Sequence, residues 1–337
     1  MKVALLAHEK FPDRAKTAVG VLRYADYDVV AVVDRDNDGT RVTDHVPDVQ
    51  DAPVVASMSD VPDGVDALVI GISPIGGAFD ESWRPDVRNA LERGCDVYSG
   101  LHYFLGDDEE FAGLAAEHGG ELWDVRKPPA DLGVADGVAD SVDATVVATV
   151  GTDCSVGKMT ATRELYEYAR AEDMDAAFVA TGQTGILIEG EGIPVDRVVS
   201  DFAAGAVERM VLEAGADHDY VFVEGQATIV HPAYSGVTAS IVHGAMPDHL
   251  VLCHEAGRDS VHGYDQRIPP VDSFVERYES FAAPVSDADV VGGMLNTRSV
   301  DGDEEAREAV ADFADAIGAP ADDPVRFDPS SVVEVIR

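Results

Sequence analysis

The sequence predicts an α/β protein made of a Rossmann-like parallel-sheet N-terminal domain and a P-loop NTPase-like α/β C-terminal domain. Three observations support this prediction. Strand-like apolar runs alternate with helical segments up to residue 125, a Pro-, Gly- and Asp-rich stretch interrupts the pattern at 127–142, and a second series begins at Ala144 with a strand, a glycine-rich loop and a helix. A length of 337 residues is typical of about two domains.

The first domain is predicted to span residues 1–128. We expect strands at 2–8, 28–34, 54–56, 67–72, 96–99 and 121–125, and helices at 15–24, 87–93 and 107–118. The run DVVAVVD at 28–34 is almost wholly apolar, as is typical of a parallel strand covered on both faces. Asp34 ends this run, where a ribose-binding acid can lie. No GxGxxG motif follows the first strand, however, so NAD binding is not favoured.

An acidic linker at 129–142 is predicted to precede the second domain, which spans 143–337. There we expect strands at 144–150, 176–180, 219–223, 250–254 and 289–295, and helices at 159–171 and 202–214. Asp201 directly precedes the second of these helices. It is therefore a candidate for the helix N-cap as well as for a catalytic acid.

Charge is the strongest feature of the composition. The chain holds 64 Asp and Glu against 24 Lys and Arg, a net charge of −40, and the acidic residues are scattered along the whole sequence. This pattern indicates a halophilic protein whose acidic surface stays hydrated in concentrated salt. It argues against nucleic acid as a partner, because phosphates require basic surfaces.

Cysteine usage and hydropathy favour a cytoplasmic protein. The three cysteines are far apart and form no CxxC pair, which excludes a disulfide framework and a cysteine-ligated zinc site. No apolar run is long enough to span a membrane, and charged residues interrupt the N-terminal segment too early for a signal peptide. We therefore expect no membrane contact and no bound metal.

The most specific motif is a phosphate loop between the strand 144–150 and the helix 159–171. Glycines let the loop backbone curl so that its N–H groups face an anion, and the helix N-terminus adds partial positive charge. A lysine supplies a full charge to a phosphate oxygen. The predicted cofactor-binding residues are Gly151, Thr152, Asp153, Cys154, Ser155, Val156, Gly157, Lys158, Met159 and Thr160.

One position of this motif departs from the usual pattern. The GTDxxVGK spacing resembles the loop of dethiobiotin synthetase, which has Ser or Thr after the lysine, whereas this chain has Met159. That hydroxyl normally holds Mg²⁺, and Thr160 lies about 100° further around the helix. The sequence therefore favours a ligand whose phosphates are held without being cut.

Further candidates follow other strands of the second domain, at the sheet edge where open α/β sheets bind ligands. After the strand 219–223 come Glu224 and Gln226, and after 289–295 comes Asn296, where related folds contact a nucleobase. Gln183, Thr184 and Gly185 lie just beyond the strand 176–180 and are predicted to bind substrate together with Gln226.

Three segments together resemble one family. They are GTDCSVGKMT at 151–160, GQTG at 182–185 and EGQATIVHPAYS at 224–235. The chain resembles a family of unknown-function proteins with a Rossmann-like N-terminal domain and a phosphate-loop C-terminal domain, members of which are described as D-glutamate N-acetyltransferases. The resemblance implies transfer of an acetyl group from acetyl-CoA to the amine of D-glutamate, with the loop gripping the CoA phosphates. It also implies a small-molecule substrate, and we expect a homo-oligomer.

Acetyl transfer to an amine requires a general base, since the amine arrives protonated. His231 is the best candidate by residue type, and Glu224 and Asp201 are alternatives. Cys154 could carry an acyl group, although a small buried residue is the simpler interpretation. The carboxylates of the substrate need arginines. The candidates are Arg163, Arg197, Arg258 and Arg298.

Two other function classes remain open. One is an ATP–Mg²⁺-dependent ligase or kinase resembling dethiobiotin synthetase, and the other is a nucleotide-binding module without chemistry. Met159 separates the first of these from the acetyltransferase, because it removes the hydroxyl that would hold Mg²⁺.

Dilution of salt should destabilise the fold. With a net charge of −40, carboxylates repel one another over a Debye length that grows from about 3 Å at 1 M to about 30 Å at 0.01 M. We expect the melting temperature, followed by circular dichroism, to fall steadily between molar and millimolar NaCl. A melting temperature that stays constant over this range would contradict the halophilic interpretation.

Overall fold

The structure, a computed structural model, describes residues 1–74 and 76–337 and divides into two compact units. Unit 1 comprises Met1–Pro128 and Gln183–Pro194, and unit 2 comprises Pro129–Gly182 and Val195–Arg337. Residues 183–194 thus group with unit 1 by their contacts, although they lie within the sequence range 143–337 of the predicted second domain. The predicted linker, 129–142, belongs to unit 2.

Unit 1 is built on a parallel sheet in the strand order β3-β2-β1-β4-β5-β6. The strand order reverses between β1 and β4, as it does in dinucleotide-binding folds, so the Rossmann-like prediction is confirmed. The strands are β1 (Lys2–Leu6), β2 (Asp28–Val33), β3 (Val54–Val55), β4 (Ala67–Ile70), β5 (Asp96–Ser99) and β6 (Leu122–Asp124). The α-helices are α1 (Lys16–Tyr24), α2 (Arg84–Glu92), α3 (Glu109–His118) and α5 (Gln183–Glu189).

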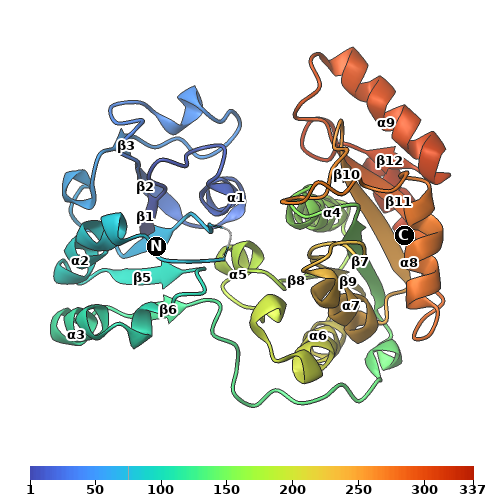
Figure 1. Cartoon of the computed structure of the whole chain (residues 1–337), viewed down its shortest axis with the longest axis horizontal. Coiled ribbons are helices and arrows are strands. Elements are labelled where there is room, and N and C mark those ends of the chain that lie inside the picture. The colour runs from blue at the N-terminus through green and yellow to red at the C-terminus, as the bar shows by residue number, and fades with distance from the viewer. Residues whose placement is uncertain (75) are drawn as a thin grey trace. The chain divides into compact units, whose positions relative to one another are not determined.

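Local signals explain where these helices begin. The predicted helix 87–93 begins earlier, at Arg84, because Pro85 fits the first turn, where a missing N–H breaks no helical bond. The helix α3 begins later than predicted, because the Asp108 side chain accepts hydrogen bonds from the backbone N–H groups of Glu110 and Phe111. The helices α2 and α3 pack side by side (Figure 1).

Unit 2 contains a second parallel sheet, in the strand order β12-β11-β10-β7-β9-β8. The first strand of the unit, β7, lies between β9 and β10, which places the switch point of the sheet beside the glycine-rich loop that follows β7. The strands are β7 (Thr145–Gly151), β8 (Ala176–Val179), β9 (Tyr220–Val223), β10 (His249–Glu255), β11 (Asp289–Asn296) and β12 (Ala321–Asp322). The α-helices are α4 (Lys158–Ala171), α6 (Ser200–Gly215), α7 (Ser235–Ala245), α8 (Ser273–Ala282), α9 (Asp303–Ile317) and α10 (Ser330–Ile336).

The core of unit 2 forms where the strands are most apolar. From Val146 to Gly151, β7 is buried, as is the stretch 250–253 of β10. Helices cover the sheet, with α6 and α7 packed together (Figure 1). The fold therefore matches the P-loop-type prediction, and it brings the loops after β7, β8, β9, β10 and β11 to one edge.

The predicted acidic linker is held against helix α6. The Glu208 side chain, 5% exposed, accepts hydrogen bonds from the backbone N–H groups of Asp136 and Val138, at 2.6 and 2.8 Å. Gly205 lies so close to this segment that a Cβ there would be 2.3 Å from the carbonyl oxygen of Gly133. These contacts explain why a segment with weak periodicity still has a defined path.

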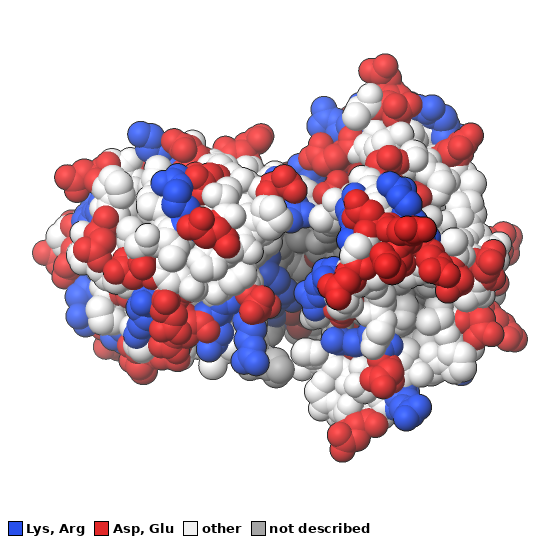
Figure 2. All heavy atoms as spheres, turned by 90° about the horizontal axis from the view of Figure 1, so that it is seen from above, with Lys and Arg blue, Asp and Glu red and all other residues white. Residues whose placement is uncertain are grey.

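Short 3₁₀ helices complete the described structure. They are η1 (Val42–Asp44), η2 (Met58–Asp60), η3 (Glu81–Trp83), η4 (Leu105–Asp107), η5 (Ala139–Ser141) and η6 (Val195–Arg197). Across residues 1–74 and 76–337, no helix has both the length and the apolar character needed to cross a membrane. Asp and Glu side chains are spread over the visible surface of both units, with Lys and Arg among them (Figure 2).

Candidate functional site

The phosphate loop connects β7 to α4 through two left-handed residues. Ser155 has a φ of 58° and Gly157 a φ of 109°, a value that a side chain would strain. Lys158 begins α4 and is 5% exposed, and its Nζ donates a hydrogen bond to the carbonyl oxygen of Asp153 at 2.7 Å. A Cβ on Gly151 would lie 2.9 Å from that Nζ, so glycine at this position gives the lysine room to cross the loop.

The segment after β10 is fastened to this loop by the carboxylate of Asp153. This side chain is fully buried, and its Oδ2 accepts hydrogen bonds from Arg258 Nε at 3.1 Å and from the backbone N–H of His262 at 2.8 Å. Arg258 also donates to the carbonyl oxygen of Cys154 at 3.3 Å and lies 3.5 Å from Glu255. The sequence made Arg258 a candidate for substrate binding. In the structure, it holds the phosphate loop instead.

His231 lies beside the loop and is almost wholly buried, at 1% exposed. Its Nδ1 accepts hydrogen bonds from the backbone N–H groups of Ala233 and Tyr234, at 3.1 and 3.2 Å. The ring proton is therefore on Nε2, which lies 3.3 Å from the carbonyl oxygen of His262. In this arrangement His231 is a hydrogen-bond donor, whereas the sequence interpretation makes it a base.

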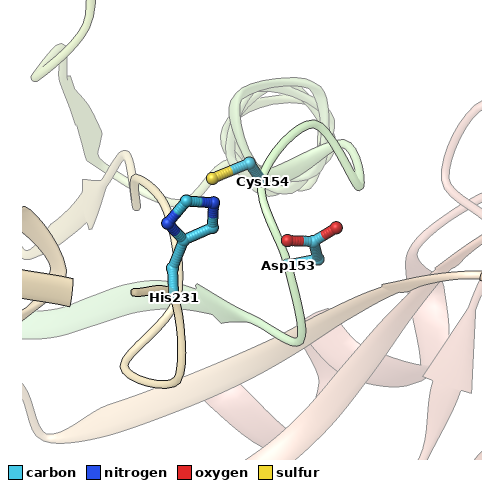
Figure 3. A group of neighbouring side chains, drawn as sticks. All are labelled: Asp153, Cys154 and His231. Carbon is cyan, nitrogen blue, oxygen red and sulfur yellow. The ribbon is translucent and has the colours of Figure 1, made fainter. Parts of the chain in front are cut away.

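Three side chains of unit 2 converge at this point (Figure 3). One carboxylate oxygen of Asp153, the Sγ of Cys154 and one ring nitrogen of His231 all lie within 4.8 Å of one another. The side chain of Cys154 points toward the His231 ring in Figure 3. Cys154 is partly exposed, so the expectation of a small buried residue is wrong.

Glu224, which follows β9, connects two neighbouring loops at the same edge of the sheet. It is 4% exposed, and its Oε2 accepts hydrogen bonds from the backbone N–H groups of Thr181 and Gly182, at 3.1 and 3.0 Å. Gln226 adds a bond from Nε2 to the carbonyl oxygen of Thr181 at 2.6 Å. These bonds tie the segment after β9 to the segment after β8. A Cβ on Gly225 would lie 1.8 Å from the carbonyl oxygen of Thr149, so this approach requires glycine.

The other predicted residues divide between the units. Asn296 ends β11 near the loop, because a Cβ on Gly157 would lie 3.8 Å from its Nδ2. Arg163 lies in α4, where it pairs with Glu167. Gln183, Thr184 and Gly185 belong to α5 in unit 1, where the Thr184 hydroxyl bonds that of Thr17 at 2.8 Å.

Asp201 does not cap α6. The helix begins at Ser200 with Val199 at the N-cap position, so Asp201 lies in the first helical turn and is exposed. The N-cap prediction is therefore wrong. An acidic side chain in the first turn still favours the helix dipole, which explains its position without a catalytic role.

Tyr278 was not predicted from the sequence, yet its hydroxyl organises the start of the loop. The hydroxyl donates to the carbonyl oxygen of Gly151 at 2.6 Å and lies 3.3 Å from the Gly151 nitrogen and 3.4 Å from that of Ile229. Burial is the main cause that raises its pKa to about 12, so the group stays a neutral hydroxyl. In the sequence, Tyr278 is marked only by its helical spacing from Phe274. Such spacing is typical of the buried face of a helix and does not indicate a functional site.

His254 contacts the loop from the other side. Its Nδ1 lies 2.7 Å from the Thr152 hydroxyl, and Thr152 is fully buried. Burial is the main cause that lowers the pKa of His254 to about 4, and the charge of Arg258 lowers it further. His254 is therefore neutral near pH 7.

Comparison with known proteins places the whole chain in context. A family model described as a domain of unknown function (DUF1611_C), P-loop domain, matches residues 133–333, and one described as DUF1611_N, Rossmann-like domain, matches residues 35–128. A protein named D-glutamate N-acetyltransferase from Tritonibacter scottomollicae is 38% identical over 279 residues, covering 81% of each chain. One of the same name from Pseudoalteromonas sp. is 35% identical, covering 80% of this chain and 81% of the relative.

A solved structure shares the complete architecture. The crystal structure of a DUF1611 family protein from Anabaena variabilis superposes with a TM-score of 0.95 at 36% identity. It covers 99% of this chain and 98% of its own.

The buried His254 should make the stability of the protein depend on pH under acidic conditions. Its folded pKa of about 4 lies below the usual histidine pKa of 6.5, so the unfolded chain binds a proton first as the pH falls. The stability that neutral His254 contributes is present above pH 6.5 and is lost as the pH falls from there toward 4. In melting curves over this range, His254→Gln should lose less stability than the wild type. The exposed His118→Gln should behave as the wild type does, and equal pH slopes for all three proteins would refute the assignment.

Proposed function

The chain belongs to the DUF1611 family, and on this premise we propose that it transfers the acetyl group of acetyl-CoA to the amine of D-glutamate. The observation that carries the proposal is the likeness to two curated relatives named D-glutamate N-acetyltransferase, at 38% and 35% identity. The likeness extends over about four-fifths of both chains, so it includes both types of domain.

The loop geometry supports CoA as the phosphate-bearing ligand. Coenzyme A carries a 3′-phosphate and a diphosphate, and a left-handed loop at a helix N-terminus suits such groups. Lys158 donates a hydrogen bond to a carbonyl oxygen of its own loop, which is a neutral acceptor. A phosphate is a charged acceptor, so it would form a stronger hydrogen bond with the lysine and take the place of that carbonyl. The second residue of α4 is Met159, which has no oxygen to hold Mg²⁺.

The geometry favours one of the three predicted catalytic residues. Glu224 is occupied by two backbone N–H groups, and Asp201 is exposed in the first turn of α6. His231 is the one in the described cluster beside the phosphate loop. We propose that its Nε2–H group donates a hydrogen bond to the carbonyl oxygen of the acetyl group. Negative charge develops on that oxygen during attack by the amine.

The acceptor amino acid needs donors for its carboxylates. Arg163, Gln183, Thr184, Gly185 and Gln226 remain the predicted substrate contacts. ATP–Mg²⁺ is the alternative cofactor, and the ligase or kinase class requires it.

An assay of thiol release tests the function directly. In molar salt, the purified protein with acetyl-CoA should release CoA when D-glutamate is added, much faster than with L-glutamate, and activity should persist in EDTA because Met159 provides no ligand for Mg²⁺. Ellman's reagent measures the thiol, and mass spectrometry identifies N-acetylglutamate. Absence of product, or an absolute requirement for ATP and Mg²⁺, would replace this function with the ligase or kinase class.

Removing the loop lysine should weaken cofactor binding selectively. A charge-assisted hydrogen bond contributes about 1.5–3 kcal/mol, so Lys158→Ala should raise the Kd of CoA by roughly tenfold or more, measured by calorimetry. Lys127→Ala is the matched control, because this exposed lysine pairs with Asp107 in unit 1. An unchanged Kd for Lys158→Ala, with an unchanged melting temperature, would reject the phosphate-loop assignment.

A further inference from the structure

We propose that Cys154 accepts the acetyl group as a thioester before the amine does, so that transfer proceeds in two steps through an acetyl-enzyme. This inference rests on the proposed function, which supplies acetyl-CoA as donor. It is carried by the convergence of Asp153, Cys154 and His231 at the phosphate loop (Figure 3).

Position within the fold singles out Cys154 among the three cysteines. It lies in the loop after β7, and its side chain is partly exposed, whereas Cys95 and Cys253 are buried. Burial raises the pKa of the Cys253 thiol to about 12, and it also raises that of Cys95. Those two thiols therefore stay protonated and out of reach, while Cys154 lies at the loop that would hold CoA. The proposal requires the pantetheine arm to fold back, so that the thioester reaches Cys154 while the phosphates stay on the loop.

The environment of the sulfur contains a hydrogen-bond donor. The Nδ1 of His231 is occupied by two backbone N–H groups, so Nε2 bears the proton. In Figure 3, the ring nitrogen further from the backbone, Nε2, lies on the side of the ring that faces the Cys154 side chain. The proton at Nε2 now faces the carbonyl oxygen of His262 at 3.3 Å, a long contact. Negative charge on the sulfur, or on the thioester oxygen when that sulfur attacks, would be a stronger acceptor for the same proton.

The environment also contains a buried acceptor. Asp153 is fully buried, and its Oδ1 has no hydrogen-bond partner among the described residues, while its Oδ2 is held by Arg258 and His262. A buried carboxylate oxygen without a partner is costly, so its presence needs an explanation. Accepting the proton of the thiol, and later one from the substrate amine, provides one.

A metal ion is the competing interpretation of the same three side chains. It is disfavoured because a ligating histidine offers a lone pair to the metal and donates its other N–H to an acceptor. His231 shows the reverse pattern toward the backbone: Nδ1 already accepts, and Nε2 has the proton. The guanidinium of Arg258, 3.1 Å from Asp153, also opposes a cation at this position.

The two steps balance in atoms and protons. In the first, the Cys154 proton passes to the Asp153 carboxylate, the sulfur bonds the acetyl carbon, the carbon–sulfur bond to CoA breaks, and the CoA thiolate takes the proton from Asp153. In the second, the ammonium of D-glutamate loses one proton to solvent, and its nitrogen bonds the acetyl carbon. The carbon–sulfur bond to Cys154 then breaks, and the second proton from nitrogen returns to the sulfur through Asp153. The sum is acetyl-CoA plus D-glutamate giving CoA, N-acetyl-D-glutamate and one proton.

The full chain, mixed with acetyl-CoA in the absence of glutamate, tests the acetyl-enzyme. The wild type should gain the mass of one acetyl group, on the peptide that contains Cys154 and in a form that hydroxylamine removes. It should also exchange labelled CoA into acetyl-CoA, and D-glutamate should discharge the adduct. Cys154→Ser should lose both the adduct and the exchange, with a fall in kcat of about 10³-fold or more, and should keep the wild-type melting temperature and Kd for CoA.

Cys95→Ala is the control, because it removes a thiol from unit 1 and should keep the adduct on Cys154. If the wild type transfers acetyl to D-glutamate but shows neither adduct nor exchange, the acetyl-enzyme is refuted and the proposed function stands. If no transfer to D-glutamate occurs, the proposed function itself fails. Stoichiometric zinc in the purified protein that is lost in both Cys154→Ser and His231→Ala would establish the metal site instead and overturn the proposal.

Discussion

The site depends above all on the buried carboxylate of Asp153. Its Oδ2 draws the segment after β10 onto the loop after β7, through Arg258 and the backbone of His262. The carbonyl group of His262 in turn faces His231, which comes from the segment after β9. One carboxylate thus relates three segments that are distant in sequence. Its burial is tolerable because Arg258 is both an ion-pair partner and a hydrogen-bond donor.

Neutral polar groups complete what this ion pair begins. The hydroxyl of Tyr278 spans Gly151 and Ile229, and the Thr152 hydroxyl bonds His254, whose low pKa keeps its ring neutral near pH 7. Although the chain has a net charge of −40, these contacts of its phosphate loop are made by neutral hydroxyl and imidazole groups. Additional carboxylates there would repel an anionic ligand.

Sequence patterns anticipated the elements better than the contacts between them. Both sheets and the loop at 151–158 could be predicted, because apolar runs and a glycine-rich turn are local signals. The position of α5 could not, since Gln183–Glu189 reads as a continuation of the P-loop series and its burial in unit 1 depends on the tertiary fold. The functions of Asp153 and Tyr278 were also hidden, because their partners lie far away in sequence. Asp201 misled because an acid near a helix start can occupy either the cap or the first turn.

The placement of α5 has a consequence for how the protein is made. Six of its seven residues are buried, from Gln183 to Ile188, and they pack in unit 1, whose own sheet is complete by Asp124. On the ribosome, the earlier part of unit 1 emerges first, and the segment that finishes its apolar surface arrives only after β7, α4 and β8 have been synthesised. Domains generally fold as units during synthesis, N-terminal first. Here helix α1, against which α5 packs, is synthesised long before the helix that covers it.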